Sequence, residues 1–398
     1  MRLPEGLANG TSRRVFFFSV VLLTIEFLDE LVFGAREAAW PLIRTDLGLS
    51  YAQVGLLLGV PGVIGNLIEL PLGVLGDVWN RRRLIVGGGV VFGLGLLFIA
   101  LAPSFWVLLL ALILFYPASG AFVSLSEATL MDLSPQRHEQ AMARWTLAGS
   151  LGVVGGPFVL GAAVWVGWGW RGLFVALAIS SLVLAFITWG RPFLQQDSPL
   201  ESVEGGLRAG FMGALQAIRC REVLHWSTLL LFSDFMLDVL LGFLALYFVD
   251  VVGVTPALAG SAIAVWSVVG LLGDALLVPL LEKVRGLVYL RYSAALILIL
   301  FPAFLLTPTY SIKIVLLGVM GFANAGWYAI LKAQLYTTLP KKSGTVMTIN
   351  TFFSILAGFV PALLGFIAEQ VGLAWMMWLL ILGPVALLVG IRPAYANE

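Results

Sequence analysis

The sequence of 398 residues is 60% hydrophobic and only 11% charged, and its formal net charge is +1. This composition is typical of a protein that crosses the membrane many times, and the near-neutral charge gives no indication of a nucleic-acid or acidic partner. A single cysteine, Cys220, excludes a disulfide framework and a cysteine-rich metal site. We expect neither a metal nor a cofactor.

Twelve apolar runs follow one another along the chain. A helix needs about 20 mostly apolar residues to cross roughly 30 Å of hydrocarbon, and charges, prolines and glycines mark the ends of each run. The first run is similar to a signal peptide, but "EFLDE" follows it instead of a small-residue cleavage site, so we interpret it as a span. The sequence predicts membrane helices over residues 15–43, 51–76, 84–102, 104–133, 138–165, 171–191, 223–252, 256–281, 287–306, 310–338, 343–368 and 373–391.

The second half of the chain repeats the first at an offset of 205 residues. Such a repeat predicts one structural unit used twice, so we expect an all-α membrane protein of two six-helix bundles, residues 1–192 and 223–398. The linker 193–222 is predicted to carry a short surface helix, with an unstructured basic loop as the alternative. The pairs are Asp29 with Asp234, Gly48 with Gly253, Gly55 with Gly260, Gly65 with Gly270, Glu69 with Asp274, and Asp77 with Glu282.

Basic residues favour the cytoplasmic side of a membrane. Most of the 23 Lys and Arg residues fall on one side when both termini are cytoplasmic. We therefore predict a protein of the inner or plasma membrane with both termini in the cytoplasm, and we expect a monomer. The exceptions are Arg36, Arg44, Arg171 and Lys313 near the outer face and Lys332 within a span.

The loop between the second and third spans carries a charge cluster. Asp77 follows the end of one predicted span, and Arg81, Arg82 and Arg83 precede the start of the next. An acid that faces the positive end of a helix can lock the cytoplasmic ends of the two halves together and must release them when they part. The repeat keeps an acid there, Glu282, so we predict a gate. The alternative is that the arginines only anchor the loop to anionic headgroups.

Acidic residues also lie inside the spans, where an ionisable side chain is costly and marks a functional site. Crowded carboxylates in a low dielectric cannot all stay ionised, so at least one is expected to bind a proton near neutral pH. The alternatives are a fixed network with Arg36 and Lys332, or a divalent-metal site made only of carboxylates. The first span carries Glu26, Asp29, Glu30, Phe33 and Glu37 on one helical stripe, and the seventh carries Asp234 and Asp238 one turn apart.

Two six-helix halves joined by a cytoplasmic loop resemble the major facilitator superfamily over essentially the whole chain. The family's loop motif matches Gly73, Asp77, Arg81 and Arg82, although Val78 and Asn80 depart from it. The motif of its antiporters on the fifth helix matches Gly152, Gly156, Pro157 and Gly161, which close helix packing would also explain. The arginine that many of its proton-linked drug exporters carry on the fourth helix would fall near Tyr116. The segment "FLDELVFGAREAAWPLIRTDLGLSYAQVGLL" is similar to exporters of the fosmidomycin-resistance kind.

The resemblance implies that the first, fourth, seventh and tenth helices line a central cavity. Glu127 and Lys332 are repeat mates on the fourth and tenth helices and would contribute to it. The resemblance also implies that the fifth and eighth helices face each other, so we predict an ion pair between Arg144 and Asp274.

We therefore predict a secondary transporter rather than an enzyme, working by alternating access and exporting a small cationic or amphipathic organic compound in exchange for protons. The absence of a GxxxxGK[ST] loop argues against an ATP-driven pump, and the absence of HExxH and GxSxG argues against an intramembrane hydrolase. Two alternatives remain open: a proton-coupled symporter or facilitator that imports a metabolite, and a non-transporting receptor on the same fold. The expected partners are a small molecule, protons and the lipid bilayer, with no nucleic acid.

Overall fold

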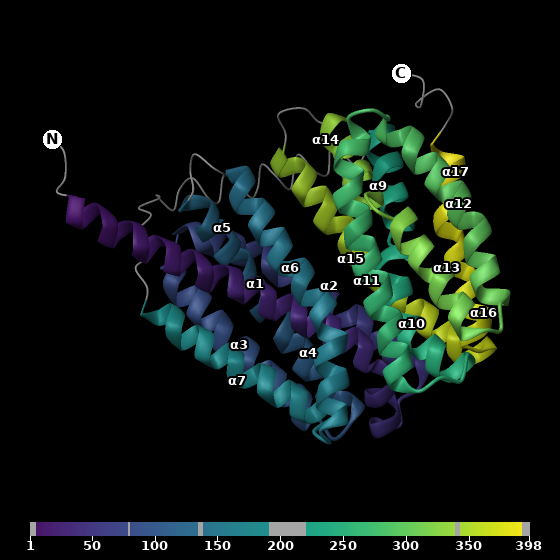
Figure 1. The fold of residues 1–398 in the computed structure, drawn as a ribbon, viewed down its shortest axis with the longest axis horizontal. Coiled ribbons are helices and arrows are strands. Elements are labelled where there is room, and N and C mark those ends of the chain that lie inside the picture. Colours follow the sequence, from purple (N-terminus) through teal and green to yellow (C-terminus); the bar gives the residue numbers. More distant parts are fainter. Residues whose placement is uncertain (1–4, 79, 134–137, 191–219, 339–342, 392–398) are drawn as a thin grey trace. The chain divides into compact units, whose positions relative to one another are not determined.

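The computed structural model describes residues 5–78, 80–133, 138–190, 220–338 and 343–391, and the described elements are helices (Figure 1). The first half contains α1 (Glu5–Leu47), α2 (Tyr51–Val78), α3 (Arg81–Leu101), α4 (Phe105–Ser119), η1 (Gly120–Ser124), α5 (Leu125–Asp132), α6 (His138–Trp165) and α7 (Gly169–Trp189). The second half contains α9 (Arg221–Ser233), η2 (Phe235–Val239), α10 (Leu240–Leu246), η3 (Tyr247–Val251), α11 (Pro256–Leu281), α12 (Gly286–Leu306), α13 (Tyr310–Ala323), α14 (Trp327–Thr338), α15 (Ser343–Val371), α16 (Leu373–Met377), η4 (Trp378–Ile381) and α17 (Leu382–Gly390).

The predicted all-helical membrane fold is confirmed. Eleven segments of the described chain are long and apolar enough to cross a membrane. The remaining predicted span is α1, which has 43 residues but carries the acidic stripe that lowers its hydropathy. The fourth and seventh predicted spans each contain turns of π-helix, at η1, η2 and η3. Such turns often occur at functional sites, because they leave backbone groups for other partners.

The repeat is visible in the turns as well as in the sequence. Gly48 and Gly253 both adopt a positive φ, at 61° and 79°, where a side chain would be strained. Two residues after each glycine a hydroxyl caps the next helix: Ser50 Oγ accepts from the backbone N–H of Gln53, and Thr255 Oγ1 accepts from that of Leu258. The 205-residue offset therefore corresponds to one local structure formed twice.

Two basic residues that the sequence places near the outer face cap helix ends. Arg171 donates a hydrogen bond to the carbonyl oxygen of Ala100 at 2.6 Å, in the last turn of α3. Lys313 donates to the carbonyl oxygen of Phe304 at 2.5 Å, in the last turn of α12. Cations are stabilised at the negative C-terminal end of a helix. This role explains why these residues depart from the distribution of the other basic residues.

The chain forms two compact units. The first unit contains Met1–Arg36 and Ile64–Leu200, and the second contains Glu37–Val63 and Glu201–Glu398. The bundle boundaries expected from the sequence stay a prediction. Most of the predicted linker, including its proposed surface helix, lies outside the described residues.

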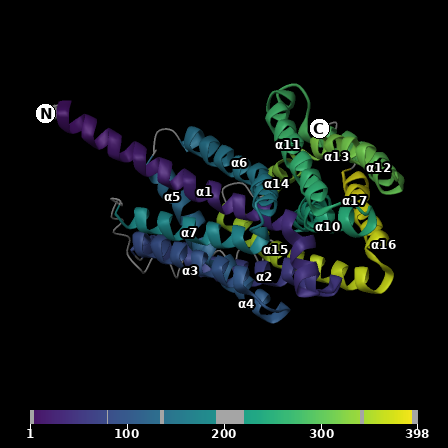
Figure 2. The ribbon, with the colours of Figure 1, turned by 60° about the horizontal axis from the view of Figure 1, so that its bottom comes forward.

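In the first unit, α3 packs beside both α4 and α7, as Figures 1 and 2 show from two directions. Phe92 of α3, Phe122 of η1 and Phe174 of α7 are fully buried. Ser181 of α7 donates a hydrogen bond to the carbonyl oxygen of Gly89 at 2.9 Å, so the two backbones lie close together. This packing holds the fourth predicted span, and with it Glu127, in place against its neighbours.

In the second unit, the first half of α2 packs against α15. A Cβ atom on Gly55 would lie 2.9 Å from the Cα atom of Gly365, and one on Gly59 would collide with the carbonyl oxygen of Gly358. Glycines on both helices thus allow the two backbones to touch. This contact explains why residues 37–63 belong to the second unit.

Candidate functional site

The acidic stripe of α1 lies partly inside the first unit. Glu26 is only 7% exposed, and Asp29 and Glu30 are half-buried. Helix α6 packs against this stripe, and a Cβ atom on Gly149 would lie 2.6 Å from Glu26 Oε1. The absence of a side chain at Gly149 therefore leaves the space that the Glu26 carboxyl group occupies.

Four acids of the predicted site are brought together in this unit. The carboxylates of Glu30, Asp29 and Glu127 interact electrostatically with Glu26. Ser119 of α4 donates a hydrogen bond from Oγ to Asp29 Oδ1 at 2.8 Å. We call Glu26, Asp29, Glu30 and Glu127 the α1 cluster.

A guanidinium group lies near the position where the resemblance leads one to expect an arginine on the fourth helix. Arg36 of α1, which is 6% exposed, donates a hydrogen bond to Tyr116 Oη at 2.9 Å. Its guanidinium carbon also lies 5.2 Å from the ring centroid of Phe33 and 5.4 Å from that of Tyr116. The positive charge comes from the first helix, while the fourth supplies the phenol that binds it.

The glycines of the α6 motif bring α6 against α1. A Cβ atom on Gly152 would lie 2.5 Å from the carbonyl oxygen of Phe27, and one on Gly156 would collide with the backbone of Ala35. Pro157 lies inside the helix beside them. A Cβ atom on Gly161 would meet no atom within 4 Å. Close packing of α6 on the acidic stripe thus accounts for Gly152 and Gly156.

We expect Gly149→Ala to displace the Glu26 carboxyl group, because the new methyl group would lie 2.6 Å from Oε1. A flexible side chain moves more easily than backbone, so the variant should fold and melt close to the wild-type temperature, with a changed pH dependence of transport. Gly155→Ala on the same helix is the control, because its Cβ atom would meet only the Leu31 Cδ1 methyl group, at 3.0 Å. An equal change in the pH dependence of transport in both variants would show that the effect comes from helix packing and not from the Glu26 carboxyl group.

The second unit contains the repeat mates of Asp29 and Ser119, which are Asp234 and Asn324. Asp234 is half-buried where α9 meets the π-turn η2, and Asp238 is exposed within that turn. Asn324, the repeat mate of Ser119, is 3% exposed and donates from Nδ2 to the carbonyl oxygen of Met236 at 3.0 Å. In both units, a polar side chain on the fourth span of the repeat therefore donates a hydrogen bond to the first span. The acceptor in the first unit is Asp29 itself. The acceptor in the second unit is the carbonyl oxygen of Met236, two residues from Asp234.

The remaining predicted cavity and pair residues lie in separate units. Lys332 is half-buried in the second unit and donates to Tyr328 Oη at 2.9 Å. Asp274 of the second unit accepts a hydrogen bond from the backbone N–H of Gly326 at 2.9 Å. Arg144 is exposed on α6 in the first unit. An ion pair between Arg144 and Asp274, and neutralisation of Glu127 by Lys332, stay predictions.

Two of the predicted gate residues, Arg81 and Arg82, have partners within the first unit. Arg81 forms an ion pair with Asp132 at the end of α5, and the Arg82 guanidinium carbon lies 5.2 Å from the Trp189 ring centroid. Glu282 is exposed at the end of α11 in the second unit. Gly73 and Asp77 lie on α2, and the side chain of Asp77 lies outside the described part of the chain. The gate stays a prediction.

A polar network joins the ends of α1 and α2 to the second half of the chain. Arg44 NH1 forms an ion pair with Asp250 Oδ2 at 2.9 Å, and Tyr51 Oη donates to the same oxygen at 3.0 Å. The Arg44 guanidinium carbon lies 4.2 Å from the centroid of the Tyr51 ring. The backbone N–H of Tyr51 donates to Glu369 Oε2 at 2.8 Å. We call these four residues the Arg44 network.

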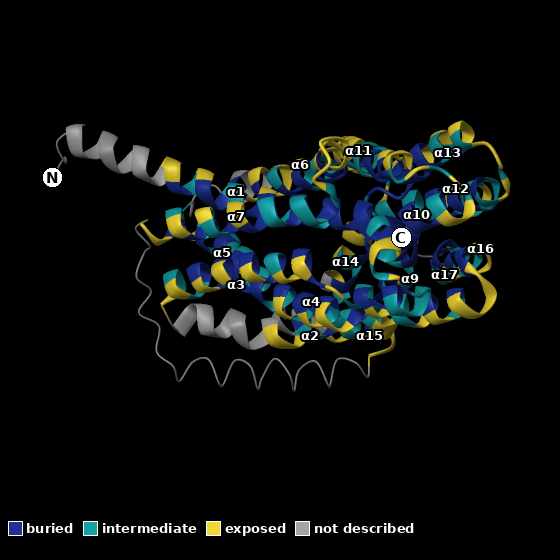
Figure 3. Cartoon of the chain, turned by 90° about the horizontal axis from the view of Figure 1, so that it is seen from below, coloured by how far each residue is buried: buried dark blue, intermediate teal, exposed yellow. Residues whose placement is uncertain are grey.

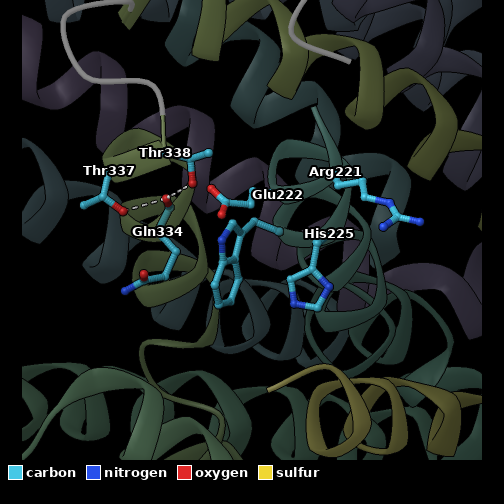
Figure 4. A pocket seen from close by; sticks show the side chains of 7 residues that line it. Arg221, Glu222, His225, Gln334, Thr337 and Thr338 are labelled. Carbon is cyan, nitrogen blue, oxygen red and sulfur yellow. Dashed lines mark hydrogen bonds between the residues drawn. The ribbon is translucent and has the colours of Figure 1, made fainter. Parts of the chain in front are cut away.

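A polar pocket of about 660 Å³ lies between the start of α9 and the end of α14 (Figure 4). Arg221, Glu222, His225 and Gln334 are among the residues that line it. Asp234 lies nine residues beyond His225, about 14 Å along the helix at 1.5 Å per residue, so the pocket is separate from the acids. Among the described residues, no group of three or more His, Cys, Asp or Glu side chains has an arrangement that could hold a metal ion.

Repeated helical units with carboxylates inside the spans are typical of secondary membrane transporters. A family model described as Major Facilitator Superfamily matches residues 22–361. The chain therefore belongs to the major facilitator superfamily, whose members are transporters and not enzymes.

Three proteins of known name are similar to this chain. The transcription regulatory protein OpdE of Pseudomonas aeruginosa is 29% identical over 301 residues, which are 72% of this chain and 71% of the relative. A probable sugar efflux transporter of Helicobacter pylori is 28% identical over 181 residues, 44% of each chain. A solved bacterial homologue of the human lysosomal transporter Spinster, in an inward-facing and unoccupied conformation, has a TM-score of 0.71 at 19% identity and covers 95% of this chain and 94% of its own.

Proposed function

We propose that this transporter exports a small cationic or amphipathic organic compound in exchange for protons. The observation that carries the proposal is the burial of Glu26 inside a membrane-spanning unit, with Asp29, Glu30 and Glu127 acting on it electrostatically. A carboxylate buried in a span is costly unless it is paired or protonated. The cluster can therefore hold a proton in one state of the carrier and a cationic group of the substrate in another.

Exchange follows from competition for the same negative charge. A ligand can shift a two-state equilibrium only by its differential affinity for the two states. If proton and substrate bind the α1 cluster alternately, each leaves when the other arrives, and the two move in opposite directions. Asp234 of the second unit, the repeat mate of Asp29, is proposed to take part, and we favour Asp29, Glu30 and Asp234 over Glu127 as proton carriers.

The direction of transport is proposed from two sources. The α6 motif matches that of antiporters in the family, and one relative is named a probable sugar efflux transporter. An organic cation suits the acidic cluster and the aromatic side chains beside it, since aromatic faces attract cations. Phe33 lies on the acidic stripe, and Tyr116 lies next to Arg36.

The substrate class is tested by thermal unfolding of the purified protein with a panel of organic cations, neutral sugars and organic anions. Binding to the folded state raises the melting temperature. We expect stabilisation by at least one organic cation and a loss of that stabilisation in Glu30→Gln. Stabilisation by sugars or anions alone would contradict a cationic substrate.

A second candidate function is regulation without transport, and it rests on the name of the relative OpdE, a transcription regulatory protein. A ligand that stabilises the protein but never crosses the membrane would favour this function. Uptake into vesicles that contain the purified protein distinguishes the two, because a transporter moves more ligand than it can bind.

The proposed orientation places both termini in the cytoplasm. A reporter that is active only in the cytoplasm is therefore expected to be active when inserted near Ser202 and inactive when inserted near Gly167. The physical reason is the preference of basic loops for the cytoplasmic side. The opposite result at both sites would reverse the orientation.

A further inference from the structure

An apolar groove of about 620 Å³ runs along the first unit between α2, α3 and α4. Ile68 lines it from α2, Gly87 and Val91 from α3, and Leu110 and Pro117 from α4. Among the described residues that line it, Arg83 alone is polar. A groove with such a lining is suited to hydrocarbon and holds water poorly, because water needs several polar partners.

The groove opens onto the surface of the unit. Ile68 and Leu110 are 41% and 65% exposed, and Figure 3 shows exposed residues along α3 and α4. Large apolar side chains exposed on membrane-spanning helices face lipid, so the groove is open to the bilayer. Its occupant therefore comes from the hydrocarbon of the membrane.

Two neighbouring glycines on α3 give the groove its shape. Gly88 allows close packing on η1, since a Cβ atom there would lie 2.8 Å from the backbone nitrogen of Phe122. A Cβ atom on Gly87 would meet no atom within 4 Å, so the missing side chain at this position leaves open space. Along α4 and η1 the lining residues run from Leu110 to Ala121, which is about 16 Å at 1.5 Å per residue. This matches the roughly 15 Å of hydrocarbon in one leaflet, so an acyl chain fits along the groove.

Arg83, the charged residue among the described lining, differs from the two arginines before it in the sequence. Arg81 is paired with Asp132, and Arg82 lies over the Trp189 ring. The guanidinium group of Arg83 has no hydrogen bond or ion pair among the residues that the structure describes, and the residue is exposed. Arg83 lies in the first turn of α3, where the positive end of the helix dipole also favours an anion.

We propose that this groove binds one anionic glycerophospholipid, with an acyl chain along α3 and α4 and the phosphate at Arg83. The apolar length selects a chain, and the unpartnered guanidinium selects a negatively charged headgroup. The site lies between helices of the first unit and does not depend on what the protein transports.

The proposal is tested by native mass spectrometry of the full-length, delipidated protein titrated with phosphatidylglycerol or with zwitterionic phosphatidylcholine of the same chains. We expect one phosphatidylglycerol molecule to bind more tightly than the rest. Arg83→Gln should weaken it about fivefold, whereas Arg285→Gln, which removes an exposed arginine elsewhere, should not. Val91→Phe should abolish the tight binding by filling the groove, and Val90→Phe, one residue along the same helix and outside the groove, should preserve it.

Three outcomes would overturn the proposal. Equal binding of phosphatidylcholine would show that the headgroup charge is not recognised. Wild-type binding by Val91→Phe would place the lipid elsewhere. A doubled protein mass in place of a bound lipid would assign the groove to a second copy of the chain.

Discussion

Neutralising the cavity acids one at a time, as Asp29→Asn, Glu30→Gln and Asp234→Asn, is expected to abolish pH-driven transport in at least one variant while substrate exchange at equal pH survives. A neutral amide fills the same space but cannot take up or release a proton. Proton-driven steps then stop, whereas the two folded states can still interconvert with substrate bound.

The same assay needs a control acid on the same helix. Asp46 is exposed at the far end of α1 and outside the α1 cluster, so Asp46→Asn should keep normal pH-driven transport. If every cavity variant also behaves normally, the carrier is uncoupled or uses another ion. The acids would then serve only to attract substrate.

The second large effect is expected at the contact between α2 and α15. Gly55→Ala should place a methyl group 2.9 Å from the Cα atom of Gly365 and in collision with the carbonyl oxygen of Pro361. Both neighbours are backbone and cannot move aside cheaply. Overpacking of this kind costs about 1–3 kcal/mol, so we expect a lower melting temperature and a severe loss of transport.

The repeat supplies the matched control for this variant. Gly260 occupies the equivalent position in the second half, but a Cβ atom there would meet no atom within 4 Å. Gly260→Ala should therefore be neutral or stabilise the protein by up to about 1 kcal/mol, since alanine favours a helix interior over glycine. Equal losses of melting temperature and transport in the two variants would show that the effect of Gly55→Ala does not come from the α2–α15 contact.

The parts of the structure that the sequence predicts well are those that depend on local pattern. Hydropathy and helix-breaking residues locate the spans, and the offset that pairs Gly48 with Gly253 also pairs the positive-φ turns found there. The acidic stripe of α1 follows from helical spacing alone. Glu26 is buried in the first unit, so this part of the stripe faces the neighbouring helices.

The parts that could not be predicted depend on contacts between distant residues. Nothing in the spacing of Arg44 and Asp250 indicates their ion pair, because it forms only when the ends of α1 and α2 pack on the second half. The Arg36–Tyr116 hydrogen bond likewise joins two helices. Comparing position 116 alone with the arginine of the family's fourth helix does not reveal it. A signal did exist for Ser119 and Asn324, since the 205-residue offset pairs two polar residues on apolar helices.

Proton coupling through the acidic residues is tested most directly by transport into vesicles under an imposed pH gradient. With the lumen more acidic than the medium, we expect the wild-type protein to accumulate an organic cation inside, and a protonophore to abolish the accumulation. Accumulation under the opposite gradient would indicate symport, and accumulation that ignores the gradient would contradict proton coupling altogether.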